Sequence, residues 1–380
     1  MNPIYLDNNA TTALHPEVWE AMRPYVLAAP GNAASTHRFG RHARQAVEVA
    51  RERVAHLLDA APDEILFTSG ATEANNLAIL GLNASSSPPG FILTTNIEHP
   101  CVLEPIRLLC ERGYTRRDFP VSGEGIACVD DFSFPETTRL AALMLANHET
   151  GAVQPVEALA RQLPRGVHLH CDAAAAAGKM PISFRKLGAS TLTISAHKFH
   201  GPQGVGALLV RKGVKVRPLQ FGGHQQQGRR PGTEPTALAV GLATALDFTL
   251  RSLDVNHAKL LRLRERFLSA IRSVAAPVIL NGPEIGGLPH AINLSFPGCS
   301  ADILMMRLDL AGVACSTGSA CSSGSLLPSP VIAAMGKTDA ELRSALRFSL
   351  DASITEADID EAARRIIDCV VKLRKHDNFL

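Results

Sequence analysis

The sequence predicts an α/β fold: a large domain with a mainly parallel mixed sheet and a smaller α+β domain near the C-terminus. Short apolar runs rich in β-branched or aromatic residues alternate with helical patterns over most of the length, as in βαβ units. After about residue 255 the pattern changes to long charged helices around fewer strands. We place the large domain at residues 13–255 and the small domain at residues 1–12 and 256–380.

The elements of both domains are expected from periodicity. Strands of the large domain are predicted at six apolar runs: 64–68, 91–94, 140–145, 167–171, 191–195 and 206–210. Between them, apolar residues spaced by three and four, as over 43–58, predict helices. In the small domain we expect helices over 257–273 and 355–375 and strands over 291–296 and 345–350.

Composition narrows the range of partners. The 380 residues carry 38 basic and 36 acidic side chains, a net charge of +2, which argues against nucleic acid or an anionic membrane and for a small-molecule partner. No apolar run approaches the roughly 18 residues that span a bilayer, and the start lacks a basic stretch before an apolar one, so we expect a cytoplasmic protein. The eight cysteines show no C-x-x-C pair and no histidine spacing typical of zinc, so no metal site is expected.

Two segments at strand ends suggest a phosphate-bearing cofactor. The stretch 68–75, Thr-Ser-Gly-Ala-Thr-Glu-Ala-Asn, leads from a strand into a helix, whose free N–H groups favour an anion and to which Thr72 could add a hydroxyl. The alternative is an ordinary capped turn. Lys198 follows the strand 191–195 beside Ser195 and His197, where a desolvated amine could form a Schiff base. A solvated loop lysine is the alternative.

Lysine is scarce, which shortens the search for a reactive amine. There are nine lysines against 29 arginines, and we interpret Lys179, Lys186, Lys212 and Lys215 as loop or edge residues that face solvent. Lys198 is therefore the candidate.

Three further side chains complete the set of candidates. Asp172 directly follows the apolar run 167–171 at the C-terminal end of that strand, where a carboxylate could pair with a pyridine nitrogen or simply cap a helix. Cys321 lies in a small, polar, glycine-containing stretch and is the reactive-thiol candidate; Cys315 is expected to be buried, and a redox pair of the two stays open. Arg347 interrupts an apolar strand and could bind a substrate carboxylate or an internal acidic residue.

Together these segments resemble the cysteine desulfurases, a branch of the fold-type-I, class-V aminotransferase-like enzymes that use pyridoxal 5′-phosphate. The resemblance covers nearly the whole chain, and the order and spacing of its motifs are specific. The matching segments are 5–12, 67–76, 98–100, 147–154, 170–179, 195–206, 230–233, 319–321 and 346–350.

The resemblance implies a role for each candidate. Lys198 would hold the cofactor, Asp172 would pair with the pyridine nitrogen and His99 would stack on the ring. The phosphate would be held by Ala71, Thr72, Ser195, His197 and, across the interface of a homodimer, Thr233. Arg347, with Asn147 and His148, would bind L-cysteine, and Cys321 would take its sulfur as a persulfide, leaving L-alanine. A sulfur-acceptor protein would follow, as in iron–sulfur cluster assembly.

Two positions depart from the family pattern. The chain has Asn147-His148-Glu149 where the family usually has Asn-Asn-Glu, and Ala175 where a glutamine commonly donates to the phenolic oxygen of the cofactor. We hypothesise that His148 supplies the missing donor.

Four alternatives stay open. A selenocysteine lyase or related β-lyase would use the same scaffold, and an aminotransferase would need no thiol nucleophile. A catalytically silent scaffold for acceptor proteins would not need Lys198, Asp172, Cys321 and Arg347 together. A dehydrogenase is disfavoured because no G-x-G-x-x-G turn follows the first strand.

Overall fold

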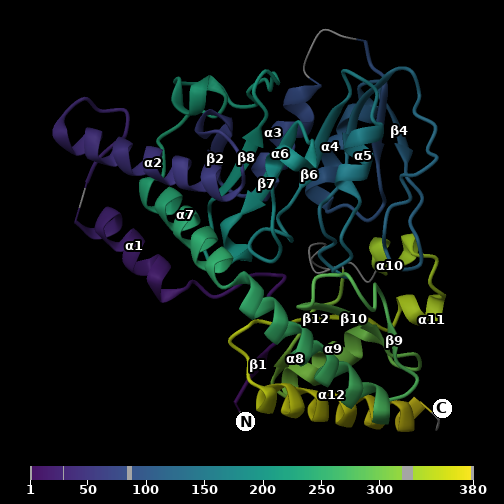
Figure 1. The fold of residues 1–380 in the computed structure, drawn as a ribbon. Helices are drawn as coiled ribbons and strands as arrows, with labels where there is room; N and C mark the ends of the chain where they lie inside the picture. Colours follow the sequence, from purple (N-terminus) through teal and green to yellow (C-terminus); the bar gives the residue numbers. More distant parts are fainter. Residues whose placement is uncertain (1, 29, 84–87, 319–327, 378–380) are drawn as a thin grey trace.

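The fold is a large α/β lobe packed on a smaller α+β lobe (Figure 1). The computed structural model describes residues 2–28, 30–83, 88–318 and 328–377, with side chains up to Lys375. Within this part no single helix is both long and apolar enough to cross a membrane, although two consecutive helices bent by 67° meet that criterion together by length and composition.

A seven-stranded sheet forms the centre of the large lobe, in the order β2-β8-β7-β6-β5-β3-β4. β8 runs antiparallel to both of its neighbours, and the remaining pairs are parallel, which confirms the predicted mixed, mainly parallel sheet. Its strands are β2 (Ile65–Thr68), β3 (Phe91–Thr94), β4 (Thr115–Asp118), β5 (Thr138–Ala142), β6 (His168–Asp172), β7 (Thr191–Ser195) and β8 (Gly206–Val210).

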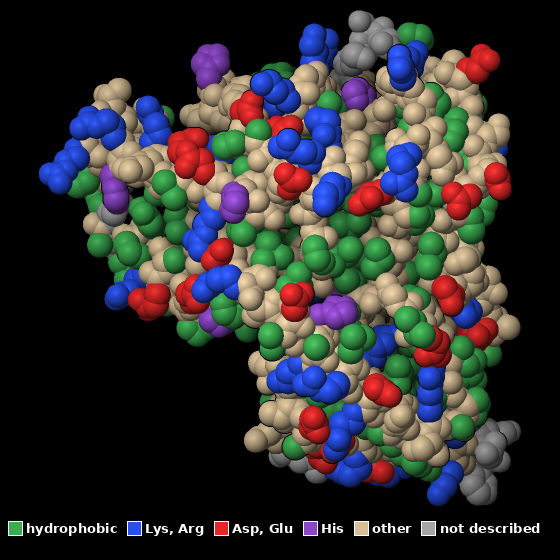
Figure 2. Space-filling model, in the orientation of Figure 1, with side chains coloured by type: hydrophobic (Ala, Val, Ile, Leu, Met, Phe, Trp, Pro, Cys, Tyr) green, Lys and Arg blue, Asp and Glu red, His purple; other side chains and the backbone are tan. Residues whose placement is uncertain are grey.

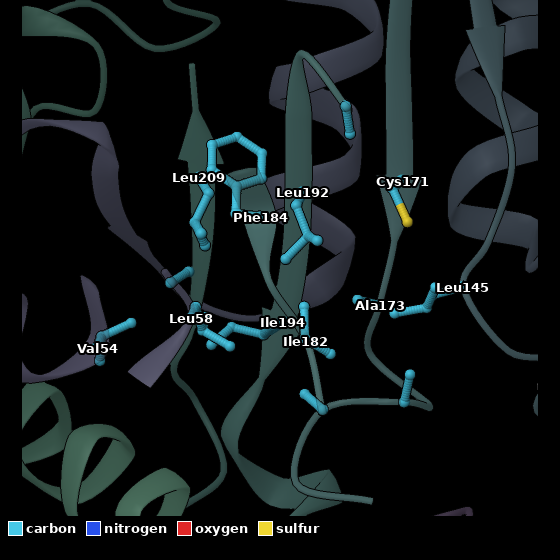
Figure 3. Close-up of a cluster of buried hydrophobic side chains, with 14 of the residues drawn as sticks. Val54, Leu58, Leu145, Cys171, Ala173, Ile182, Phe184, Leu192, Ile194 and Leu209 are labelled. Carbon is cyan, nitrogen blue, oxygen red and sulfur yellow. The ribbon is translucent and has the colours of Figure 1, made fainter. Parts of the chain in front are cut away.

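Helices cover both faces of this sheet because successive strand residues point to opposite sides. Leu192 and Ile194 of β7 and Leu209 of β8 pack in one cluster, drawn in Figure 3, while Leu208 and Val210 belong to the cluster on the other face. The first face is covered by α1 (Pro16–Leu27), α2 (Arg38–Leu57), α5 (Val156–Gln162), α6 (Phe184–Leu187) and α7 (Thr236–Arg251), the second by α3 (Ala71–Leu82) and α4 (Pro100–Glu111).

The small lobe has its own core. An antiparallel sheet in the order β12-β10-β9 packs with three helices, and β1 pairs in parallel with β11. The elements are β1 (Ile4–Tyr5), α8 (Leu253–Val274), β9 (Ile279–Leu280), β10 (Ala291–Ser295), α9 (Ala301–Leu310), β11 (Val313–Ala314), α10 (Pro330–Ala334), α11 (Asp339–Leu342), β12 (Ala345–Ser349) and α12 (Glu356–Asp377). The helix α8 begins at Leu253 and so spans the residue at which we placed the domain boundary.

Three short 3-10 helices complete the described elements: η1 (Pro62–Glu64), η2 (Ala196–Lys198) and η3 (Gln225–Gly228). Basic and acidic side chains are intermixed over the face shown in Figure 2, in keeping with the near-zero net charge.

Candidate active site

A cavity of about 590 Å³ lies where the carboxyl ends of the parallel strands meet the small lobe. This edge of an open α/β sheet is where ligands bind in such folds. The cavity brings together nine of the predicted site residues: Ala71, Thr72, His99, His148, Asp172, Ser195, His197, Lys198 and Arg347. Two others, Asn147 and Thr233, do not line it, and Cys321 lies outside the described residues.

Lys198 is positioned by η2, which turns the chain directly after β7. Its Nζ donates hydrogen bonds to the carbonyl oxygens of Asn9 and, at 3.1 Å, Ala10. These two residues belong to the N-terminal segment, whose strand β1 pairs within the small lobe. The amine is therefore held in the cavity wall by a segment that joins the two lobes, rather than being a solvated loop lysine.

Asp172 is held as an acceptor at the end of β6. Its Oδ1 accepts from the backbone N of Ala174 at 2.9 Å, and its Oδ2 accepts from Nδ2 of Asn75 at 2.7 Å. Turns follow over residues 174–179, so the aspartate caps no helix. The carboxylate is instead directed at the cavity that Lys198 shares.

Two histidine rings meet in the same wall. His99 is the N-cap of α4, and its ring lies edge-on to that of His148, with ring centroids 5.3 Å apart. Burial lowers the pKa of His99, and burial together with the nearby His99, Arg347 and Lys198 lowers the pKa of His148 well below its usual value. Both rings are therefore neutral at physiological pH and present hydrogen-bonding nitrogens rather than charges.

The opposite end of the cavity fits an anion. Helix α3 begins after Gly70 with no side-chain cap on its first turn, so its N–H groups point at the cavity end lined by Ala71 and Thr72. Ser195 ends β7 close by, since a Cβ built on Gly70 would lie 3.9 Å from its Oγ. Burial lowers the pKa of His197 to about 4, so this residue adds a neutral imidazole.

Arg347 on β12 makes the internal salt bridge that the sequence left open, and it also lines the cavity. Its Nη2 lies 2.8 Å from Oδ1 of Asp7, an internal salt bridge, and its Nη1 donates to the carbonyl oxygen of His148 at 3.3 Å. Its Nε is buried without a hydrogen-bond partner among the described residues, and the side chain lines the cavity. A guanidinium that lines a cavity can bind a carboxylate.

The prediction that Lys179 faces solvent is wrong. Lys179 lines the same cavity as Lys198, and burial lowers its pKa to about 8. Lys179 lies at the end of the turns over residues 174–179 after β6, and Ala174 and Ala175 of the same turns also line the cavity. The cavity therefore contains two amines; Lys186, Lys212 and Lys215 are exposed as predicted.

Comparison with known proteins agrees with this geometry. The model of the family Aminotransferase class-V matches residues 4–362. The cysteine desulfurase IscS of Dictyoglomus turgidum is 40% identical over 98% of this chain and 95% of its own. A solved NifS-like protein superposes with a TM-score of 0.90 at 33% identity over 100% of both chains, and SspA in complex with cysteine with a TM-score of 0.81 at 31% identity over 91% of this chain and 98% of its own.

The chain belongs to the cysteine desulfurase family of class-V aminotransferases.

In this member of the cysteine desulfurase family, the two residues that depart from the family pattern, His148 and Ala175, both line the cavity. Ala175 presents only a methyl group to the cavity, and His148 lines it as well. Nδ1 of His148 is buried and has no hydrogen-bond partner among the described residues. The compensation between these two residues therefore stays a prediction.

Two predicted contacts look different in the structure. Asn147 is fully buried, its Nδ2 donates to the carbonyl oxygen of Ile97 at 3.0 Å, and its Oδ1 accepts from the backbone N of Glu149 and Thr150. It therefore supports the turn that carries His148, and we revise its predicted substrate contact accordingly. Thr233 is exposed before α7, so its predicted role in a second subunit stays a prediction.

Sequence reasoning missed the residues that position the site. Asn75 pairs with Asp172 across 97 residues of the sequence, and Asp7 pairs with Arg347 across 340 residues. Both Asn75 and Asp7 fall within the matching segments, but no local sequence pattern shows these pairings. Glu149, which accepts from Ser329 Oγ at 2.7 Å over 180 residues, was missed for the same reason.

Proposed function

We propose that this chain is a pyridoxal-phosphate-dependent cysteine desulfurase that converts L-cysteine to L-alanine and transfers the sulfur to Cys321 as a persulfide. The observation that carries the proposal is the convergence of Lys198, Asp172 and Arg347 on one cavity from strands of both lobes. The names of the relatives, one of them described in complex with cysteine, support the same substrate.

The donor set of the cavity fits the cofactor. An amine, Lys198, is available for its aldehyde, and the carboxylate of Asp172 for its ring nitrogen. The uncapped first turn of α3 and the neutral His197 suit its phosphate. The neutral imidazole of His148, which lines the cavity, would add a further polar contact. When bound, pyridoxal phosphate draws electrons from the substrate carbons and so makes the Cβ–S bond labile.

The residues of the chain then orient the substrate. Arg347, whose side chain lines the cavity, would hold the substrate carboxylate with its guanidinium, which fixes the amino acid across the cavity. Lys198, the amine nearest to the N-terminal carbonyl groups, would accept and return the Cα proton. His99, neutral and facing the same space, is placed to move a proton at the sulfur or at the adjacent carbon.

Sulfur transfer requires a thiolate. Cys321 would attack the substrate sulfur, so that an S–S bond forms while the Cβ–S bond breaks and its electron pair stays with the carbon skeleton that becomes alanine. Cys315 does not suit this role, because burial raises the pKa of its thiol to about 12. It is therefore a natural control.

The test compares the turnover of L-cysteine and L-selenocysteine by the wild type, Cys321→Ala and Cys315→Ala. A cysteine desulfurase loses sulfide release with Cys321→Ala and keeps it with Cys315→Ala. Sulfide release that survives Cys321→Ala, or turnover restricted to selenocysteine, would overturn the proposal in favour of a selenocysteine lyase.

We further propose that the enzyme is a homodimer in which Thr233 completes the phosphate site of the partner subunit. Thr233 is exposed and absent from the cavity of its own subunit, and Phe221, earlier on the same segment, is 88% exposed. Light scattering during gel filtration gives the mass directly. A monomer that retains the cofactor would refute this part.

A further inference from the structure

A line of buried hydrogen bonds beside the cavity connects the carboxylate of Asp172 with the ring of His99. At its centre is Asn75 of α3, which is completely buried. Its Nδ2 lies 2.7 Å from Oδ2 of Asp172 and 3.0 Å from Sγ of Cys101, and its Oδ1 lies 3.0 Å from Nε2 of His170. One amide thus contacts the carboxylate, a thiol and an imidazole.

The chemistry of these groups gives the line a single direction. A carboxylate oxygen accepts, so the amide nitrogen of Asn75 faces Asp172 and its oxygen faces His170. His170 must then donate from Nε2, which leaves its Nδ1 to accept from Oγ1 of Thr191 at 2.9 Å. Burial lowers the pKa of His170 to about 4, so this ring is neutral and has one proton to place.

The other end of the line is the ring of His99. Its Nδ1 accepts from the backbone N of Cys101 at 3.1 Å and lies 2.9 Å from Sγ of the same residue. Burial raises the pKa of the Cys101 thiol, so the thiol keeps its proton and donates it to that nitrogen. Since Nδ1 is occupied as an acceptor, the proton of the neutral ring sits on Nε2.

We propose that Asn75 and Cys101 are positioning residues that hold His99 as its Nε2-protonated tautomer and fix the carboxylate of Asp172 through the same amide. The inference rests on the proposed function, in which these two groups serve one bound cofactor. It assigns Nε2 as the atom through which His99 delivers a proton. It also makes Asp172 and His99 respond together to a change at Asn75.

The first test reads the His99 tautomer directly. Nitrogen NMR of the full-length holoenzyme, labelled with ¹⁵N-histidine, is compared for the wild type, Cys101→Ala and Cys101→Ser. Losing the thiol donor in Cys101→Ala should lower the ratio of the Nε2-protonated to the Nδ1-protonated tautomer of His99 on the order of fivefold. This is the change expected from the net free energy of one ordinary hydrogen bond. The serine variant restores a donor and should restore the ratio.

A matched control lies on the same helix. Cys110 is half-buried in α4 and takes no part in the line, so Cys110→Ala should leave the His99 signals unchanged. A wild-type ring protonated on Nδ1, or an unchanged ratio in Cys101→Ala, would overturn the assignment.

The same spectra give the pKa of His99. It should rise in Cys101→Ala, because the lost donor stabilises only the neutral ring. The charged or titratable groups near this ring include Asp172 on β6, Lys198 after β7, Arg347 on β12 and the neighbouring His148, and none of these is replaced in that variant.

The second test addresses the link between Asp172 and His99. Asn75→Leu removes the shared amide, so it should shift both the His99 tautomer ratio and the visible absorption band of the cofactor, which senses Asp172. A shift in only one of the two would overturn the link. These readouts need no turnover, so they stay distinct from a failure of the proposed function, which would appear as absent sulfide release from L-cysteine by the wild type.

Discussion

Replacing Arg347 separates its internal salt bridge from its proposed contact with the substrate. Arg347 is 4% exposed, with Nη2 2.8 Å from Oδ1 of Asp7, while its Nε has no partner among the described residues. Asp7 also accepts from Oγ of Ser316 at 2.7 Å. In Arg347→Gln the carboxylate of Asp7 loses its charged partner and keeps, among the described residues, this neutral donor.

The two effects have different magnitudes. Removing one partner of a buried pair costs about 3–5 kcal/mol, and we expect the lower end, about 3 kcal/mol of unfolding free energy, because the side chain of Asp7 is 16% exposed. A substrate carboxylate would lose charge-assisted hydrogen bonds together worth about 3 kcal/mol, which lowers kcat/KM for L-cysteine by about 100-fold.

The assay combines urea unfolding with sulfide-release kinetics for Arg347→Gln, Asp7→Asn and the double variant. The double variant leaves no unpaired carboxylate, so it should recover most of the lost stability. Its kcat/KM should stay about 100-fold low. If kcat/KM recovered together with stability, Arg347 would act only through the fold and its proposed contact with the substrate would be refuted.

Three further predictions concern the turn that carries His148. Restoring the family residues by His148→Asn and Ala175→Gln, singly and together, should change the pKa of the visible cofactor band non-additively; additive changes would contradict their compensation. Gly318→Ala should destabilise the protein by about 1–3 kcal/mol in thermal unfolding, because the new Cβ would lie 1.9 Å from Oε2 of Glu149. Gly123→Ala is the control and should have no such effect, because a Cβ there would meet nothing within 4 Å. Equal effects of the two changes would contradict this packing. Burial raises the pKa of Glu149 from 4.5 to about 6, so the stabilising effect of its protonated form is present below pH 4.5 and is lost as the pH rises through 6. The unfolding free energy of Glu149→Gln, measured by urea titration, should therefore rise by about 2 kcal/mol relative to that of the wild type between about pH 4 and pH 7. A difference that does not depend on pH would refute this prediction.

The centre of the sheet was predictable because its strands are buried on both faces. β3, β7 and β8 match the predicted runs residue for residue, since continuous apolar residues between turns are typical of such strands. β4 was missed. It is an edge strand with the sequence Thr-Arg-Arg-Asp, and it pairs only with β3, so its pattern carries no apolar signal.

The site was predictable in its chemistry but not in its contacts. Asp172 ends β6 and Lys198 lies in the short helix after β7, so their positions at strand ends and the family motifs both indicated them. Lys179 was misplaced because nothing in its neighbours shows that the turn after β6 folds inward. The pairing of β1 with β11, about 310 residues away, likewise leaves no local trace, yet it brings the N-terminal segment to the amine of Lys198.

The central claim is that the cofactor is carried by one particular amine. Reduction of the purified enzyme with borohydride, followed by proteolysis and mass spectrometry, fixes the cofactor to the lysine that holds it. The account predicts a pyridoxyl-phosphate mass on the peptide that contains Lys198. The same mass on the peptide that contains Lys179, the second amine of the cavity, or on neither, would contradict it.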